Sequence, residues 1–228
     1  AIRALEFIGV LCRGGQRHIA DKSVRYALLE EWFPEIKEPL APEAAFDSLV
    51  KRYVTLFGPV GIEDLCWWFP VTKAMALDSL IRLDKKIVRV QWEGREYLME
   101  AEDYRSYENH EPSRDDGDVV CFLPYEDHFP KAYVGRSWFF PEEAEALVTR
   151  PGTIFRGQIF PSIWINGEIV GGWELVWQDK KKSAAEIKIT GLVSQVDTDK
   201  PTKDLIEKKR HELERFVNKG IIPLMKSR

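Results

Sequence analysis

The sequence lacks any apolar run near the roughly 20 residues that span a bilayer, and no signal-peptide pattern opens it. It is also poor in residues that staple small folds or bind metals. Its three cysteines (Cys12, Cys66 and Cys121) form no CxxC pair, and its four histidines are scattered. These absences disfavour a disulfide framework and a zinc site. They make a cytoplasmic location, no membrane partner and no metal or cofactor the default expectations.

An excess of positive charge is missing as well. The chain has 33 Lys and Arg against 37 Asp and Glu, a net charge of −4. DNA-binding domains usually carry a basic footprint, so any contact with DNA must come from local clusters of cations. The P-loop, GxSxG, HExxH and dinucleotide fingerprints are absent too, which leaves those enzyme classes without support.

What is present suits a globular protein of one large domain or two to three small ones, with 228 residues, 44% of them hydrophobic. The chain begins at Ala1, without Met, in what reads as a helix as far as Ile8. Strand candidates at 10–13 and 24–29 follow, separated by glycine turn chemistry. Helix, strand, strand is the second half of a winged helix, and we expect the first half to lie upstream.

The segment from Glu43 to Met99 has the full winged-helix order. Helices are predicted over 43–57, 62–69 and 73–83, and a hairpin over 87–99 turns at Glu93-Gly94. The apolar stripe of the first helix is Phe46, Leu49, Val50, Tyr53, Val54 and Phe57, and that of the third is Ala74, Leu77, Leu80 and Ile81. A proline-rich linker over 34–42 precedes this segment.

Past a polar stretch over 101–118, interpreted as a linker or long loop, the pattern changes to short strands. The clearest signal is Asn166-Gly167, which favours a type I′ hairpin turn. Strands are predicted at 119–123, 153–160, 163–165, 168–177 and 186–193, with helices at 141–147 and 201–218.

The predicted fold class is therefore α+β. A tandem winged helix-turn-helix is followed by a small antiparallel β-rich, barrel-like domain and a C-terminal helix. The predicted boundaries are 1–34 for the half winged helix, 43–100 for the complete one, 118–195 for the β-rich domain and 200–218 for the helix.

Candidate DNA contacts gather around the third helix of the complete winged helix and its hairpin. Side chains off the helix's apolar stripe are placed to face a major groove, or form an ordinary solvated face. Residues 43–100 hold eight Lys and Arg against nine Asp and Glu, so cations at the helix-to-hairpin corner are better candidates, for phosphate contacts. The helix candidates are Lys73, Asp78, Ser79 and Arg82; the corner comprises Arg82, Lys85, Lys86 and Arg89, and Arg95 follows the hairpin turn.

Three further groups have a functional and a structural interpretation. Trp164, Trp173 and Trp177 flank the Asn166-Gly167 hairpin as minor-groove wedges or, more typically, as core. The group 125–128 (Tyr-Glu-Asp-His) reads as an acid/base site, or as caps and turns. The basic run Lys180-Lys181-Lys182 is a hairpin loop that either contacts DNA or is simply solvated.

Three motifs in order carry a resemblance that covers roughly the whole chain. These are 45–59 (AFDSLVKRYVTLFGP) followed by Asp64 and Trp67-Trp68, then 122–127 (FLPYED) followed by Tyr133 and Arg136, then 163–173 (IWINGEIVGGW). Together they resemble the winged helix DNA-binding domain superfamily that includes the AlkZ/YcaQ-like DNA glycosylases.

The resemblance implies tandem winged helices, a β-rich C-terminal part and, for characterised members, removal of alkylated or crosslinked bases from DNA. It places Asp127 at a recurrent position. Arg136 is interpreted as a partner of Asp127 or of a phosphate, and both alternatives stay open. Those members carry a catalytic Gln-x-Gln or Gln-x-Asp motif in the first winged helix, a stretch not visible here. Gln195-Val196-Asp197 has that spelling but lies near the C-terminus, and we interpret it as coincidence.

We therefore expect a protein that binds double-stranded DNA and is related to DNA glycosylases, with no catalytic residue assigned. The expected DNA-binding residues are Lys73, Arg82, Lys85, Lys86, Arg89, Arg95 and Arg136. A non-enzymatic DNA-binding regulator and a protein-interaction winged helix, which the acidic net charge favours, stay open as alternatives. The sequence does not specify the lesion, a preferred DNA sequence or the oligomeric state.

Overall fold

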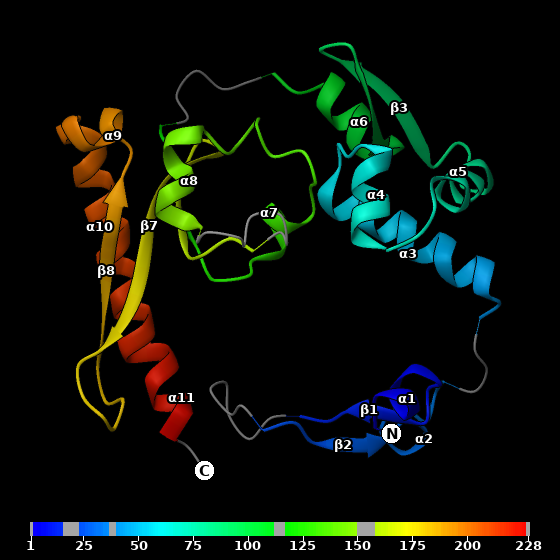
Figure 1. Cartoon of the computed structure of the whole chain (residues 1–228), viewed down its shortest axis with the longest axis horizontal. Coiled ribbons are helices and arrows are strands. Elements are labelled where there is room, and N and C mark those ends of the chain that lie inside the picture. Colours follow the sequence, from blue (N-terminus) through cyan, green and yellow to red (C-terminus); the bar gives the residue numbers. More distant parts are fainter. Residues whose placement is uncertain (1, 16–22, 37–39, 112–116, 150–157, 227–228) are drawn as a thin grey trace. The chain divides into compact units, whose positions relative to one another are not determined.

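The computed structural model describes residues 2–15, 23–36, 40–111, 117–149 and 158–226, and it mixes helices and strands along the chain (Figure 1). No helix in these ranges is long and apolar enough to cross a bilayer. The chain divides into two compact units, one formed by residues 1–40, 175–187 and 211–228 and the other by 41–174 and 188–210.

The first unit begins with the predicted helix–strand–strand order. Helix α1 (Ile2–Phe7) is followed by the antiparallel strands β1 (Leu11–Arg13) and β2 (Tyr26–Leu28), and then by a short helix α2 (Leu29–Trp32) that the sequence did not predict. Neither α1 nor α2 contains a buried residue.

The C-terminal residues of this unit, from His211 on, belong to a helix that starts in the second unit and changes its winding. Helix α10 (Lys200–Phe216) continues as a π-helical turn η2 (Val217–Ile221) and ends with α11 (Ile222–Lys226). The Asn218 side chain receives a hydrogen bond from the Ala185 N–H (2.9 Å) and donates to its carbonyl (2.7 Å), so the π turn is tied to a strand.

The second unit opens with three helices and a hairpin, in the predicted order and within a residue or two of the predicted bounds (Figure 1). These are α3 (Pro42–Phe57), α4 (Ile62–Trp68), α5 (Lys73–Arg82), β3 (Ile87–Trp92) and β4 (Arg95–Glu100). Both turn residues, Glu93 and Gly94, have positive φ, as a type I′ turn requires. An isolated bridge between Val60 and Leu98 pairs the α3–α4 connection with β4.

The buried face of α5 differs from the predicted stripe. The structure buries Ala76, Ser79 and Leu80 and leaves Ile81 70% exposed. Ser79 can be buried because its hydroxyl donates to the Asp47 carboxylate at 2.6 Å, which satisfies the polar group. Ser79 is fully buried, so the prediction that it lies on an exposed face of the helix, toward DNA or toward solvent, was wrong. Hydrophobicity alone could not place a serine in the buried stripe.

The polar stretch after the hairpin begins with a helix, α6 (Ala101–Glu108), instead of a linker. The carboxylate of Glu100 accepts hydrogen bonds from the N–H groups of Glu102 (2.7 Å) and Asp103 (3.3 Å) and so caps the helix. Acidic residues in the first turn also suit the positive end of the helix dipole. Residues 112–116 lie outside the described ranges.

The rest of the second unit contains most of a four-stranded sheet in the order β5-β6-β7-β8, with β5 and β8 at its two edges; the end of β7 and the start of β8 belong to the first unit. In the described ranges this is an open sheet, and the barrel-like closure stays a prediction because residues 150–157 lie outside these ranges. Ile206 of α10 packs with Val120, Ile163 and Val170, and the helix thereby covers a face that a closed barrel would bury. The strands are β5 (Val120–Leu123), β6 (Ser162–Ile165), β7 (Glu168–Trp177) and β8 (Ala185–Leu192), and the helices are α7 (His128–Lys131), α8 (Glu142–Val148) and α9 (Ser194–Thr198).

The turn predicted at Asn166-Gly167 and the strand predicted over 153–160 have different outcomes. Asn166 and Gly167 both have positive φ, which agrees with the predicted type I′ turn. The strand predicted over 153–160 falls mainly on residues outside the described ranges, and residues 158–160 are not in a strand.

One apolar core joins the helical and sheet-bearing parts of the second unit. Tyr53 and Leu65 from α3 and α4 belong to the same buried cluster as Phe139, Trp164 and Ile169. The rings of Phe139 and Trp164 stack with centroids 5.2 Å apart. The helix-rich segment is thus braced by the segment around residues 130–140.

Candidate nucleic-acid interface

Lys85 and Lys86 form the exposed turn between α5 and β3, and we call this pair the wing corner. Lys85 adopts the left-handed conformation (φ 67°), and backbone hydrogen bonds from Lys86 N to Leu83 O and from Ala101 N to Lys86 O fix the turn. Neither lysine forms an ion pair with a carboxylate among the described residues. Both are therefore available for an external anion.

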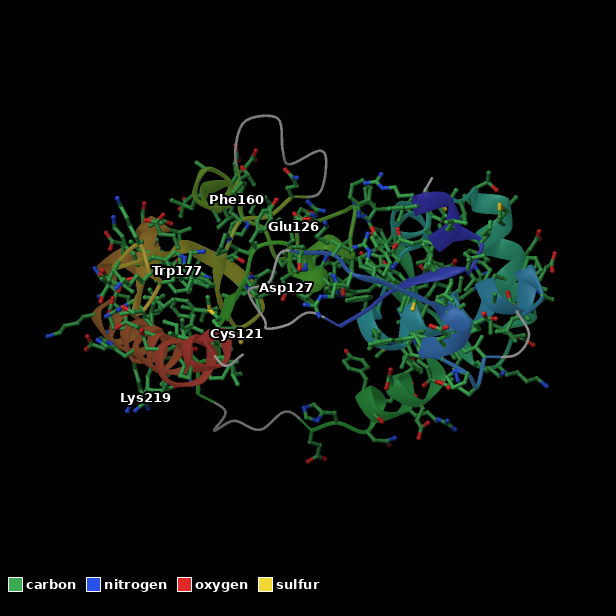
Figure 2. All side chains as sticks on the ribbon, turned by 90° about the horizontal axis from the view of Figure 1, so that it is seen from below. Cys121, Glu126, Asp127, Phe160, Trp177 and Lys219 are labelled. Atoms are coloured by element: carbon green, nitrogen blue, oxygen red, sulfur yellow. The ribbon has the colours of Figure 1, made fainter. Side chains whose placement is uncertain are left out.

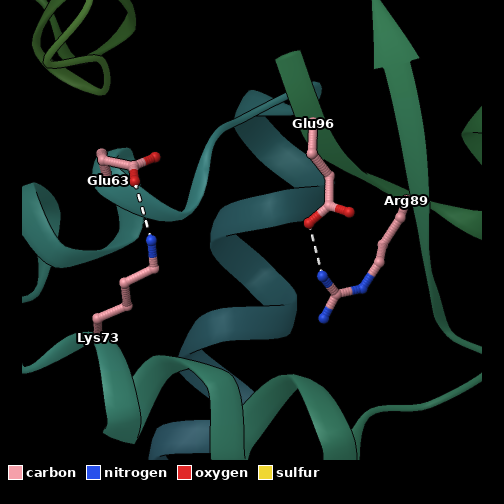
Figure 3. Close-up of polar contacts among 4 residues, drawn as sticks. All are labelled: Glu63, Lys73, Arg89 and Glu96. Carbon is pink, nitrogen blue, oxygen red and sulfur yellow. Dashed lines mark hydrogen bonds and ion pairs between the residues drawn. The ribbon is translucent and has the colours of Figure 1, made fainter. Parts of the chain in front are cut away.

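Three other predicted cations are engaged with carboxylates. Lys73, at the start of α5, reaches Glu63 of α4 at 3.3 Å, and Arg89 of β3 reaches Glu96 of β4 at 2.5 Å (Figure 3). Arg82 donates two hydrogen bonds of 2.8 Å to Asp47 of α3, and its guanidinium holds the pKa of that carboxyl below its ordinary value. Arg82 therefore ties α5 to α3.

The last two predicted cations have different surroundings. Arg95 is exposed at the first residue of β4 and forms no ion pair within the described chain. Arg136 is partly buried, donates from Nε to the Tyr133 carbonyl (3.0 Å) and lies 5.9 Å from the centre of the Trp67 ring. Burial lowers its pKa, while Asp64 and Glu126 act in the opposite direction.

Asp64 is the buried centre of the contact between α4 and the segment after α7. It is only 7% exposed, and its carboxylate accepts from the N–H groups of Val134 and Gly61, each at 2.8 Å. Burial raises its pKa against the effect of these hydrogen bonds. The sequence marked Asp64 as a motif residue and gave no signal of its partners, which lie up to 70 residues away.

Aromatic hydroxyl and indole groups make further links to the same segment. Tyr133 donates to the Phe57 carbonyl (2.6 Å), Trp67 Nε1 donates to the Lys131 carbonyl (2.9 Å), and Tyr53 donates to the Ala132 carbonyl. Burial raises the pKa of both tyrosines, which keeps them neutral donors. These motif residues, which carried the family resemblance, thus form a structural connection.

A groove of about 820 Å³ lies where this connection meets the hairpin. The start of α4, strand β4 and the segment 133–138 line it. Trp92 and Trp138, which are 52% and 46% exposed, both contribute to its lining. Sequence reasoning missed this groove because its two tryptophans are 46 residues apart and neither belongs to a recognised motif.

The proposed acid/base group has structural partners instead. Asp127 caps α7 by accepting from the Phe129 N–H at 2.9 Å, and Glu126 pairs with Lys131. Both residues lie in the loop between β5 and α7 (Figure 2). Asp127 therefore has the capping role that is common for such residues.

The tryptophans near the Asn166-Gly167 hairpin, and Asp197 of the Gln195-Val196-Asp197 sequence, also contact other parts of the protein. Trp164 is 4% exposed in the core, and Trp173 Nε1 donates to the Leu123 carbonyl at 2.9 Å. The ring centre of Trp177, the last residue of β7, lies 5.3 Å from Nζ of Lys182 in the connection that follows the strand. Asp197 is an exposed residue of α9, paired with Lys203 at 2.9 Å. The described residues contain no cluster of three or more His, Cys, Asp or Glu that could hold a metal ion.

Comparisons with known proteins agree with the resemblance seen in the motifs. No curated protein matches the chain. Among solved structures, the DNA glycosylase AlkZ of Streptomyces sahachiroi is similar in fold, with a TM-score of 0.62 at 19% identity, over 96% of this chain and 54% of that one. The chain thus spans about half the length of AlkZ. The family model described as DNA glycosylase AlkZ-like matches residues 1–216, and the chain therefore belongs to the AlkZ-like DNA glycosylase family.

Proposed function

We propose that this chain binds double-stranded DNA, with α3–α5 and the β3–β4 hairpin acting as a winged helix and the wing corner contacting phosphates. The observation that carries the proposal is the pair of unpaired, exposed lysines at that corner, Lys85 and Lys86. Lysines in such a turn position a protein on the DNA backbone without reading its sequence. Arg95 at the other end of the hairpin adds a third unpaired cation.

The remaining predicted cations contribute less in this proposal. Lys73, Arg82 and Arg89 already have carboxylate partners, and a phosphate would have to compete with these. Arg136 is held against Trp67 and Tyr133. We therefore assign the main duplex contact to the wing corner and Arg95, and we retain the other four as secondary contacts.

The test is a gel-shift titration of paired duplex DNA with two double variants of equal charge change. Lys85→Ala with Lys86→Ala removes the wing corner, and Lys51→Ala with Arg52→Ala removes two exposed cations from α3. Only the first variant should bind more weakly. If both variants lose the same affinity, the wing corner contributes only through its net charge and not as a specific contact. If the wild type does not bind duplex DNA, a protein-interaction winged helix is the better interpretation.

The catalytic part of the proposal concerns the whole protein, because AlkZ is about twice as long as this chain. We propose that the whole protein releases alkylated bases and that this chain binds the duplex on which the whole protein acts. Release of alkylated purines from duplex DNA by the full-length protein measures that activity. Duplex binding without base release would favour the non-enzymatic regulator instead.

A further inference from the structure

We propose that the groove between the hairpin and the segment 133–138 binds an unpaired nucleobase of DNA, stacked on Trp92 and Trp138. This deepens the proposed function, on which it rests for the identity of the partner. It assigns a second contact to the chain, distinct in position and chemistry from the wing corner.

The aromatic lining is the first reason. Exposed indole rings provide stacking surfaces for bases, and every base has a face that stacks. Trp92 packs against Tyr97 with centroids 6.0 Å apart, and Trp138 packs against Tyr133 at 5.2 Å. Each ring is thus held by a second ring while about half of its own surface stays exposed.

The charge of the lining is the second reason, because it suits a base better than a phosphate chain. Lys73 and Arg89 lie in the groove with their carboxylate partners Glu63 and Glu96, so these four charges cancel in pairs (Figure 3). The carboxylate of Asp64 is occupied by backbone N–H groups. The paired side chains of Glu63, Lys73, Arg89 and Glu96 supply hydrogen-bonding groups for a base.

The third reason is the position of Arg95, which lines the groove without an ion pair and can hold the phosphate attached to the stacked base. Glu93 in the neighbouring turn is the groove's remaining exposed carboxylate, and it opposes a longer run of phosphates. The volume of about 820 Å³ is within the usual range of ligand pockets, roughly 300–1,000 Å³. One nucleotide, not a length of strand, is the occupant that these features fit.

The experiment compares a duplex carrying a three-thymidine bulge with the fully paired duplex, and adds short single-stranded oligothymidylate. The wild type should bind the bulged duplex more tightly than the paired one. Trp92→Ala should weaken binding to the bulged duplex and the oligothymidylate by about tenfold to a hundredfold, since stacking on an aromatic ring has that effect. Affinity for the paired duplex should stay unchanged.

Two variants control for nonspecific effects. Trp32→Ala removes a tryptophan of equal exposure (51%) in α2, outside the groove, and should bind every probe like the wild type. Trp92→Phe should restore most of the affinity, because a smaller ring still stacks. Since Trp138 also packs on Phe139 with centroids 4.7 Å apart, Trp138→Ala is interpreted only if its thermal unfolding matches that of the wild type.

The salt dependence separates this site from the wing corner. Trp92→Ala should lower affinity for the bulged duplex without changing the slope against salt, because stacking releases few counterions. If the paired duplex binds but the bulge gives no preference, the groove assignment is wrong and the duplex proposal stands. If the oligothymidylate and the bulged duplex bind through Trp92 while the paired duplex does not bind, the groove assignment stands alone. Displacement of oligothymidylate by a proline-rich peptide, lost in Trp92→Ala, would make the groove a peptide site and overturn the inference.

Discussion

Two aspartates of neighbouring helices, Asp47 and Asp64, have pKa shifts of opposite sign for identifiable reasons. Asp47 on α3 is met by the Arg82 guanidinium and the Ser79 hydroxyl, which lower its pKa. Asp64 on α4 is buried with backbone N–H partners and forms no ion pair with a described residue, and desolvation raises its pKa. The same side chain is therefore stabilised in its charged form at one position and in its neutral form at the other.

The shift at Asp64 predicts how stability depends on pH. A folded-state pKa above the unfolded value means that the folded chain binds the proton more tightly. Stability from this group is therefore greatest at acid pH and falls as the pH rises through the folded pKa. Asp64→Asn removes this dependence and leaves one N–H unpaired, a loss of about 1–3 kcal/mol. Urea unfolding at about pH 4 and pH 7 should show a larger difference between wild type and variant at the lower pH; a difference that grows toward pH 7 would contradict the assignment.

The Arg82–Asp47 pair predicts the reverse dependence. Arg82→Lys keeps the charge but loses the two-point geometry, so the midpoint of urea unfolding should fall. Asp47 has a lowered folded pKa, so its contribution is present above the unfolded value and is lost as the pH falls through the folded one. The difference between wild type and variant should therefore shrink at acid pH. Duplex affinity should stay near the wild-type level, because lysine keeps the positive charge of this secondary contact. A variant that loses affinity but not stability would show that Arg82 is a main DNA contact instead.

At the scale of elements, periodicity predicted most helices and strands, and the exceptions have physical causes. The helix α6 was missed because its sequence has no apolar stripe; it depends on the Glu100 cap and on charge at its first turn. The buried face of α5 was misplaced because Ser79 is made compatible with burial by Asp47, 32 residues away. Local patterns do not contain such partners.

The candidate site shows the same division between local and distant information. The sequence identified every cation around the hairpin, but the partners that neutralise Lys73 and Arg89 depend on how α4, α5 and the strands pack. The groove itself could not be predicted, since Trp92 and Trp138 come to line it only when the segment 133–138 packs on α4. Residue type could be predicted, whereas pairing and juxtaposition required the fold.

Strand β7 offers a test of close packing between elements. A Cβ added at Gly172 would lie 2.7 Å from the backbone carbonyl oxygen of Leu147 in α8 and 2.7 Å from Thr190 Oγ1. Gly172→Ala must shift the helix from the sheet, and we expect a loss of about 1–3 kcal/mol in urea unfolding. Gly117→Ala is the matched control, because nothing lies within 4 Å of its added Cβ and its effect should stay below about 0.5 kcal/mol. Equal stability of the two variants would mean that α8 does not pack this closely on β7.

At the scale of the whole molecule, a net charge of −4 has to be reconciled with binding to a polyanion. The structure offers a reason why bulk charge misleads, since it separates cations that are paired from those that are not. Lys73, Arg82 and Arg89 are paired, whereas Lys85, Lys86 and Arg95 are unpaired within the described chain. The small number of unpaired cations at the hairpin predicts a duplex contact that is weak and only moderately sensitive to salt.

The dependence of duplex affinity on salt concentration measures how many of these cations contact phosphates. Each phosphate neutralised contributes a slope of about −0.9 to the logarithm of affinity against the logarithm of salt, so three cations predict a slope of about −3 for paired duplex. Lys85→Ala with Lys86→Ala should reduce it to about −1, because two of the three contacts are gone. Lys51→Ala with Arg52→Ala changes the net charge equally and should leave the slope unchanged. A wild-type slope far steeper than −3 would mean that paired cations such as Arg89 exchange their carboxylates for phosphates, and the division into paired and unpaired cations would no longer describe the bound state.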